Sequence, residues 1–307
     1  MNKYIRIMRI DHWIKQLFVI PGVVCALLLT RKDFEFCISK VLLGLFIVCL
    51  IASANYSINE WLDAEFDKYH PTKCNRTVVT EDIKGSIVLI IWFVCAGCGL
   101  LLGYWINIPF FSMCLLLLIM GIVYNVRPFR TKDLPYIDVI SESVNNAIRF
   151  LLGWFIISAS TIPPSSAIFG YWMAGAFLMA TKRFAEYRMI SNKDVAGMYR
   201  KSFRFYSERL LLISSFFYAM VSVFCVGVFL IKYRIEYILA IPLIIGLFCY
   251  YLFLAFEEDS AVQKPEKLYR EKRLLLLVGL ITCALIVLTF VDMPFLEIVV
   301  SDEVIHL

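Results

Sequence analysis

The chain has 307 residues, of which 61% are hydrophobic and 18% are charged. Soluble domains usually have about 45–50% apolar and about 25% charged residues, so this composition excludes an ordinary soluble fold. The 30 basic and 25 acidic residues leave a formal net charge of only +5, and nothing in the sequence indicates nucleic-acid binding.

Nine apolar segments follow one another along the chain, and each is long enough to cross about 30 Å of hydrocarbon as a helix of roughly 20 residues. They cover residues 14–30, 38–57, 85–104, 108–125, 137–159, 166–187, 209–231, 235–256 and 274–293. The basic N-terminus runs into the first segment without an evident cleavage site, so we interpret this segment as an uncleaved helix. The pattern predicts an all-α integral membrane protein with nine transmembrane helices in a single domain, residues 1–307.

The basic residues predict how this domain lies in the inner cell membrane. If the N-terminus is cytoplasmic, the inner segments contain most of the lysines and arginines, and the outer segments contain only Arg31, Lys32, Lys232 and Arg234. This asymmetry follows the positive-inside rule and leaves the C-terminal tail outside. The inner connections are also the long, charged ones, and such loops commonly carry function. We therefore expect the active site to face the cytoplasm.

A ladder of polar residues ends the second predicted span. Asn55, Asn59, Asp63 and Asp67 recur every four residues and so share one helix face. An acidic group near the centre of a membrane helix costs about 2.5–3.5 kcal/mol, which a bound cation can offset. Mg²⁺ prefers oxygen ligands and is commonly held by one or two carboxylates plus substrate phosphates. A solvated helix end is the alternative, but it does not explain why the amides continue the ladder into the apolar region.

The fifth predicted span has a second polar stripe, made of Asp138, Glu142, Asn145 or Asn146, and Arg149. We expect this stripe to form the second wall of a polar cavity. An intramembrane arginine needs a partner, so an internal pair of Arg149 with Glu142 or with another helix is the alternative.

Polar residues on either side of this stripe complete the predicted cavity. Tyr124 and Lys132 precede it at the expected cytoplasmic mouth. Lys182, Arg183 and Glu186 end the sixth span, where the two cations are suited to bind phosphate as a point charge and a planar fork. The basic residues in 200–204 instead suggest an amphipathic stretch at the membrane interface.

The second-span ladder resembles a motif of a known family. The sequence Asn59-Glu-Trp-Leu-Asp63-Ala-Glu-Phe-Asp67 is similar to the NDxxDxxxD first motif of the UbiA superfamily of intramembrane prenyltransferases. The resemblance implies nine helices around a central cavity open to the cytoplasmic side, with motifs that bind Mg²⁺ and a substrate diphosphate. Glu60 replaces the aspartate of the motif, which keeps the charge but moves it outward.

Four segments look like one branch of this superfamily, the decaprenyl-phosphate phosphoribosyltransferases. Residues 11–18 resemble the QWxKN-type start, residues 67–73 the DxxHPTK continuation, and residues 182–186 and 199–202 the KRxAE and RKS segments. The resemblance implies transfer of 5-phosphoribose from phosphoribosyl diphosphate to a polyprenyl phosphate, which makes a lipid-linked polyprenyl substrate and a diphosphate-bearing donor the expected partners in the bilayer.

The resemblance also implies roles for the site residues. Asn59, Asp63 and Asp67 are expected to bind Mg²⁺ and to be catalytic, and Asp138 is expected to steady the sugar hydroxyls or a second ion. The remaining substrate-binding candidates are Lys15, Lys73, Tyr124, Lys132, Glu142, Arg149, Lys182, Arg183 and Glu186.

Two other functions remain open at this point. An aromatic prenyltransferase would use the same metal site with an isoprenoid diphosphate as the donor. Phosphoribosyl diphosphate carries an additional phosphate, so the basic inner loops favour the sugar donor. A transporter would also place polar stripes in the membrane, but the ladder lies at one membrane face and no paired, broken helices are evident.

Overall fold

The computed structural model describes residues 3–31, 37–190, 192–257, 260–263, 268 and 270–296, and these contain helices and no strands. The predicted C-terminal tail beyond residue 296 and the predicted outer residue Lys32 lie outside them. The long helices are α2 (Ile20–Thr30), α3 (Ile38–Asp67), α5 (Gly85–Ile106), α6 (Ile108–Asn125), α7 (Ile137–Ile157), α8 (Ser165–Met189), α10 (Glu208–Tyr233), α11 (Ile241–Leu254) and α12 (Lys272–Phe290). The short ones are α1 (Lys3–Ile7), η1 (Ile10–Val19), η2 (Lys73–Asn75), α4 (Thr77–Thr80), η3 (Thr131–Asp133), α9 (Lys193–Tyr199), η4 (Lys201–Arg204), η5 (Ile235–Ala240) and η6 (Ala261–Gln263).

Helix boundaries follow from residues that either cannot continue a helix or satisfy its free ends. Proline occupies the first turn of α2, α6 and α11, where its missing N–H costs no hydrogen bond. Asn107 caps α6 because its Oδ1 accepts the N–H of Phe110 at 2.8 Å. Ser207 and Asn192 cap α10 and α9 in the same way.

Seven stretches of the described chain are long and apolar enough to cross a membrane. Five are single long helices, one combines η5 with α11, and one runs from Lys3 to Thr30 through α1, η1 and α2. The other two predicted spans coincide with α7 and α8, which have 21 and 25 residues but carry charged side chains. These charged side chains lower the mean hydropathy of the two helices. Several of them line a polar cavity, which explains why they occur within these spans. The chain is a multi-span membrane protein, and a total of nine crossings stays a prediction.

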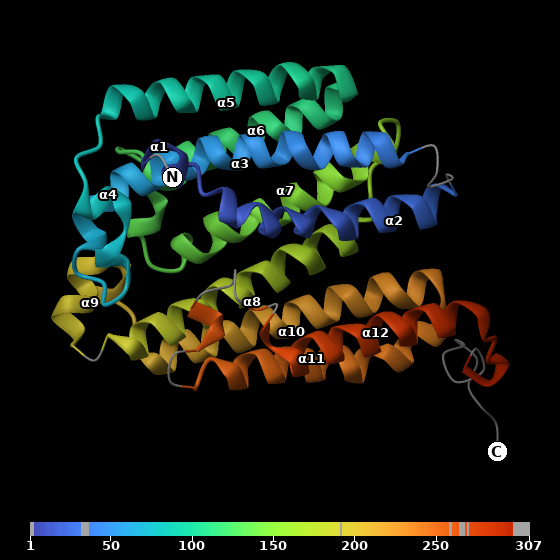
Figure 1. Cartoon of the computed structure of the whole chain (residues 1–307). Coiled ribbons are helices and arrows are strands. Elements are labelled where there is room, and N and C mark those ends of the chain that lie inside the picture. The colour runs from blue at the N-terminus through green and yellow to red at the C-terminus, as the bar shows by residue number, and fades with distance from the viewer. Residues whose placement is uncertain are drawn as a thin grey trace.

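The long helices lie side by side in two packed halves (Figure 1). One half contains α2, α3, α5, α6 and α7 around one apolar core, and the other contains α8, α10 and α11 around a second core. Contacts between α7 and α8 join the halves. The short elements α1, α4 and α9 gather at one end of the bundle, and α12 ends at the opposite end (Figure 1).

Two glycines allow α2 and α7 to cross backbone against backbone. A Cβ atom on Gly22 would lie 1.9 Å from the carbonyl oxygen of Phe150, and one on Gly153 would lie 2.1 Å from that of Val19. Lipid provides no hydrophobic driving force between membrane helices, so these helices associate through close packing, which small residues permit. This crossing fixes η1, which directly precedes α2, against the polar face of α7.

Candidate active site

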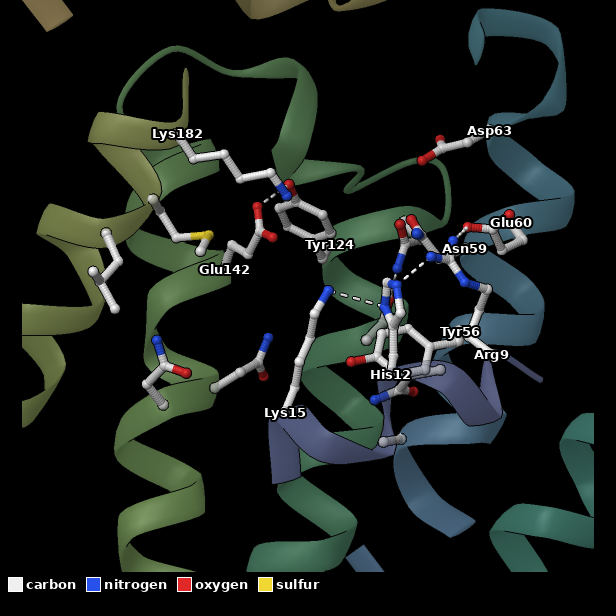
Figure 2. Close-up of a pocket in the computed structure, with 18 of the residues that line it drawn as sticks. Arg9, His12, Lys15, Tyr56, Asn59, Glu60, Asp63, Tyr124, Glu142 and Lys182 are labelled. Carbon is white, nitrogen blue, oxygen red and sulfur yellow. Dashed lines mark hydrogen bonds and ion pairs between the residues drawn. The ribbon is translucent and has the colours of Figure 1, made fainter. Parts of the chain in front are cut away.

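A polar cavity of about 340 Å³ lies between the two halves, toward the end where the short elements gather. Residues of η1, α3, α6, α7 and α8 line it, together with Tyr199 and Arg200 at the end of α9. Figure 2 shows side chains converging on this space, with Asn59, Glu60 and Asp63 on one side and Glu142 and Lys182 on the other. A smaller recess shares Asp63 and Asp67 with the cavity.

All four residues of the predicted ladder, Asn55 included, line this cavity. Asn59, Asp63 and Asp67 all line it, as their spacing by four residues predicts. Asp63 accepts hydrogen bonds from Lys132 and, at 3.2 Å, from Arg130. Asp67 is likewise paired with Arg76. Each ladder carboxylate therefore faces the cavity with a cation already beside it.

Arg76 connects Asp67 to Glu60 beside the ladder. Arg76 donates to the Asp67 carboxylate at 2.7 Å and also lies 2.9 Å from Glu60. Glu60 additionally accepts from Arg9 at 2.6 Å. Glu60 is 5% exposed and lines the cavity, so the longer side chain is directed into the site between two arginines rather than outward.

Asn55 is the one ladder residue with a packing role. Its Nδ2 donates to the carbonyl oxygen of Leu117 at 2.8 Å, and a Cβ on Gly121 would lie 2.2 Å from its Oδ1. The amide thus ties α3 to α6 beneath the carboxylates.

The chemistry of the ladder fits a magnesium ion shared with a substrate. Its oxygen donors are two carboxylates and the amide of Asn59, and no group of three or more His, Cys, Asp or Glu in the described part of the chain is arranged to hold a metal. Mg²⁺ typically takes one or two carboxylates, waters and substrate phosphates rather than an all-protein cage. The residues therefore suit an ion that a diphosphate helps to bind.

The opposite wall is a network around Arg183. This arginine is 1% exposed and pairs with Glu142, while its NH1 donates to Glu186 at 3.1 Å. Tyr124 donates to Glu142 at 2.7 Å and accepts from Arg183 at 3.1 Å. Glu142, Tyr124 and Arg183 line the cavity, whereas Glu186 lies behind them.

Asp138 lies outside the cavity lining. It is fully buried. Its carboxylate accepts from Tyr206 at 2.7 Å and from Ser202 at 3.2 Å, and it lies 3.4 Å from Arg183 and 3.5 Å from Arg200. Asp138 therefore contacts two arginines that line the cavity, and its expected role toward the sugar hydroxyls or a second ion stays a prediction.

The cavity is predominantly cationic. Among the described residues that line it, eight are Lys or Arg and four are Asp or Glu. The cations are Arg9, Lys15, Lys73, Arg76, Arg149, Lys182, Arg183 and Arg200. Such an excess of positive charge is suited to a ligand with several phosphates.

Loop residues set the charge at the mouth of the cavity. Burial opposes the charge of Lys73, but the Glu186 carboxylate, 2.8 Å away, raises its pKa above the ordinary value. Burial lowers the pKa of Lys132 to about 8, although Asp63 acts in the opposite direction. Burial likewise disfavours charged Arg200, but Tyr124, Tyr199 and Asp138 together raise its pKa well above its usual range.

His70 has the turn-forming role that its place before a proline suggests. It is 3% exposed, and its Nδ1 accepts the backbone N–H groups of Thr72 and Lys73, each at 3.2 Å. Burial, the first cause, and the nearby Lys73 charge lower the His70 pKa to about 3. The neutral ring therefore fixes the turn that carries Lys73 into the cavity.

Sequence reasoning missed several arginines of the site. Arg200 lines the cavity instead of forming an interfacial stretch, because its loop folds back onto Asp138. Arg9 and Arg130 have left-handed backbone conformations, with φ of 50° and 30°. Such conformations are costly for residues other than glycine and concentrate at functional sites. The sequence places Arg130 with Lys132 at the expected mouth of the cavity, and Arg130 lines the smaller recess there. Arg9 was not assigned to the site, and only its closeness to an apolar segment could have indicated it.

Comparison with known proteins agrees with this architecture. A model of the UbiA prenyltransferase family matches residues 18–278. The decaprenyl-phosphate phosphoribosyltransferase of Mycobacterium tuberculosis is 26% identical over 226 residues, which cover 73% of this chain and 72% of that protein. The protein of the same name from Mycolicibacterium smegmatis is 25% identical over 225 residues, covering 73% and 68%.

Solved structures share the fold at lower identity. A UbiA homologue from Archaeoglobus fulgidus bound to GPP and Mg²⁺ superimposes with a TM-score of 0.68 at 21% identity, covering 92% of this chain and 100% of that one. The same homologue bound to DMAPP and Mg²⁺ gives 0.69 at 20% identity, covering 94% and 100%. Because the family model matches most of its length, the chain belongs to the UbiA prenyltransferase family and is a membrane transferase.

Proposed function

We propose that this protein transfers 5-phosphoribose from phosphoribosyl diphosphate to a polyprenyl phosphate and releases diphosphate. One observation carries the proposal, which is the excess of eight cationic over four acidic residues among the described residues that line the cavity. Phosphoribosyl diphosphate and a polyprenyl phosphate bring four phosphate groups together. An isoprenoid diphosphate with an aromatic acceptor brings two and needs fewer cations. The names of the mycobacterial relatives support the same choice.

The ladder is assigned to the donor diphosphate. Asp63, Asp67 and Asn59 would hold Mg²⁺, and the bound ion would supply neutralising charge for the diphosphate as it leaves. Lys132 and Arg76 already lie against these carboxylates, so phosphate oxygens that enter beside them meet cations as well. Preorganised cations aimed at developing negative charge are usually the largest catalytic contribution.

The opposite wall is assigned to the rest of the donor. Lys182 and Arg183 project from α8 into the cavity, and Lys73 reaches it from the His70 turn. Glu142 lines the cavity beside Arg183 and can accept hydrogen bonds from sugar hydroxyls. The acceptor phosphate is ionised at neutral pH, so the reaction needs no general base, and no residue is assigned to that role.

Topology follows from the positive-inside distribution. We assign the end with α1, α4 and α9 to the cytoplasmic side of the inner cell membrane, which places the N-terminus inside and the mouth of the cavity toward a soluble donor. The acceptor's isoprenoid chain remains in the bilayer.

The donor assay tests the proposal. Purified protein in lipid nanodiscs receives polyprenyl phosphate with phosphoribosyl diphosphate labelled in the ribose, or an aromatic acceptor with labelled isoprenoid diphosphate, each with Mg²⁺ and with EDTA. We expect label in the extractable lipid only from the sugar donor and only with Mg²⁺. Label from the isoprenoid donor alone would assign the protein to aromatic prenylation instead.

A further inference from the structure

Arg149 lies within α7, a predicted membrane span, and its charge has no acidic partner among the described residues. It lines the cavity from α7, and no carboxylate of the described residues lies within ion-pair distance of it. Its Nε donates to the Gln16 side chain at 2.9 Å and its NH1 donates to Asn146 at 3.2 Å. A guanidinium has five N–H donors, so donors remain for a ligand. An ionisable residue within a membrane segment is costly and points to a functional site.

The position of Arg149 is rigid. Gln16, its partner, is 1% exposed and belongs to η1, and the glycine-mediated crossing of α2 and α7 holds η1 against this face of α7. Neutral amides on both sides orient the guanidinium without neutralising it. This arrangement keeps the full positive charge available, which a carboxylate partner would not.

A second set of basic groups faces the same part of the cavity from η1. Lys15 Nζ lies 2.9 Å from His12 Nδ1, and Arg9 contacts the other ring nitrogen of His12. A neutral imidazole has only one acceptor nitrogen, so two cations cannot both donate to it. Figure 2 shows Lys15 extending between His12 and Glu142 into the open space. Because the Lys15 ammonium has three N–H donors, it can donate to an anion in this space as well as to His12.

This basic region lies farther along α7 than Glu142 and next to an apolar border. Arg149 is seven residues along α7 from Glu142, which is about 10 Å at 1.5 Å per residue. Ile14 and Phe18 line the same part of the cavity and are 47% and 40% exposed, so the wall there also reaches the outer surface. A ligand with a charged head and an apolar tail fits this combination, because its tail can leave past these side chains into lipid.

We propose that Arg149 and Lys15 form a second anion subsite, which binds the phosphate group of the polyprenyl phosphate acceptor. The proposal rests on the proposed function, because it gives the donor diphosphate to the ladder and the acceptor phosphate to this subsite. The ribose, whose hydroxyls are assigned to Glu142, would then lie between the two phosphate groups. An acceptor phosphate oxygen then forms the new bond to the anomeric carbon while the bond to the diphosphate breaks, and the electron pair of that bond leaves with the diphosphate.

Kinetics of matched variants test the subsite. Arg149→Gln removes the charge and keeps a polar side chain, and Arg149→Lys keeps the charge. Arg188→Gln is the control, because Arg188 also lies on a cavity-lining helix but does not itself line the cavity. We expect Arg149→Gln to raise KM for polyprenyl phosphate by about tenfold or more while KM for phosphoribosyl diphosphate changes less than about twofold. Arg149→Lys should recover most of the loss, and Lys15→Gln should act like Arg149→Gln.

A binding measurement separates this subsite from the function itself. Polyprenyl phosphate should raise the thermal unfolding midpoint of the wild type but not that of Arg149→Gln, whereas phosphoribosyl diphosphate with Mg²⁺ should stabilise both. A raised KM for the sugar donor alone would overturn the assignment, because the subsite would then hold the 5-phosphate of the donor. Unchanged kinetics in Arg149→Gln, or equal loss of folding in Arg149→Gln and Arg149→Lys, would also overturn it. Wild-type protein that transfers no phosphoribose would instead remove the proposed function.

Discussion

The substitution Asp63→Asn examines the ladder most directly. The amide keeps the shape of the side chain and removes one of the two carboxylates that we assign to Mg²⁺. It also leaves Lys132 and Arg130 without the carboxylate that each contacts. We therefore expect two separate effects, a loss of turnover and a loss of stability.

General magnitudes, together with the exposure of Asp63, set the scale of both effects. Removing one preorganised electrostatic group commonly costs about 100- to 1,000-fold in kcat, or about 2.7–4 kcal/mol. Breaking one partner of a buried ion pair costs about 3–5 kcal/mol. Asp63 is 18% exposed toward a polar cavity, so we expect a stability loss at the lower end, about 3 kcal/mol or less.

A double variant separates the two effects. Asp63→Asn combined with Lys132→Met removes both members of the pair, so part of the thermal stability should return while activity stays lost. Glu65→Gln is the matched control, because Glu65 lies on the same helix with 64% of its side chain exposed and only a distant arginine at 3.9 Å. The assays are lipid-product formation and the thermal unfolding midpoint in nanodiscs. Wild-type turnover in Asp63→Asn with Mg²⁺ as the sole metal would refute the metal assignment.

Three further predictions concern the scaffold. The His70 pKa of about 3 lies below the ordinary value of 6.5, so the unfolded state takes up a proton at a higher pH than the folded state does. The free energy of unfolding therefore falls as the pH drops from 6.5 toward 3, and the loss at pH 5 is about 2 kcal/mol. His70→Asn should abolish this share of the pH dependence of the unfolding midpoint. Gly153→Ala forces a Cβ to within 2.1 Å of the Val19 carbonyl oxygen and should cost about 1–3 kcal/mol, whereas Gly97→Ala meets nothing within 4 Å and should not destabilise; equal midpoints would contradict the close crossing. Asp138→Asn should lower kcat/KM for the sugar donor while the KM for the lipid acceptor stays unchanged, because the two arginines beside it lose their anchor; an unchanged donor kcat/KM would exclude this positioning role.

Periodicity predicted the parts of the site that lie on one helix. The four-residue spacing of Asn59, Asp63 and Asp67 was enough to place them on one cavity wall, since a helix face is fixed by local geometry. The same reasoning placed Glu142 and Arg149 on the opposite wall. The all-helical, multi-span membrane architecture, the family and the transferase activity were likewise predicted correctly from composition, span pattern and motif order, whereas the total of nine spans stays a prediction.

Contacts between distant segments were beyond such reasoning. Asp138 shares a stripe with Glu142, but whether a side chain at the end of that stripe reaches the cavity depends on Tyr206 and Ser202, which arrive from another loop. Arg200 looked interfacial because sequence alone does not reveal that its loop folds over the cavity. Glu60 pairs with Arg9 across 51 residues, a contact that no local pattern encodes.

The ion pairs of the ladder carboxylates have a consequence for the order in which ligands bind. A divalent ion that enters alone has to separate Asp63 from Lys132, which leaves a buried ammonium without its carboxylate, or Asp67 from Arg76, which leaves the guanidinium with Glu60 alone. A diphosphate that enters with the ion offers those same groups new oxygen acceptors. Metal and diphosphate therefore strengthen each other's affinity, and by linkage the enhancement is equal in both directions. Free Mg²⁺ is expected to be a weak ligand of this protein, and the magnesium–diphosphate complex a strong one.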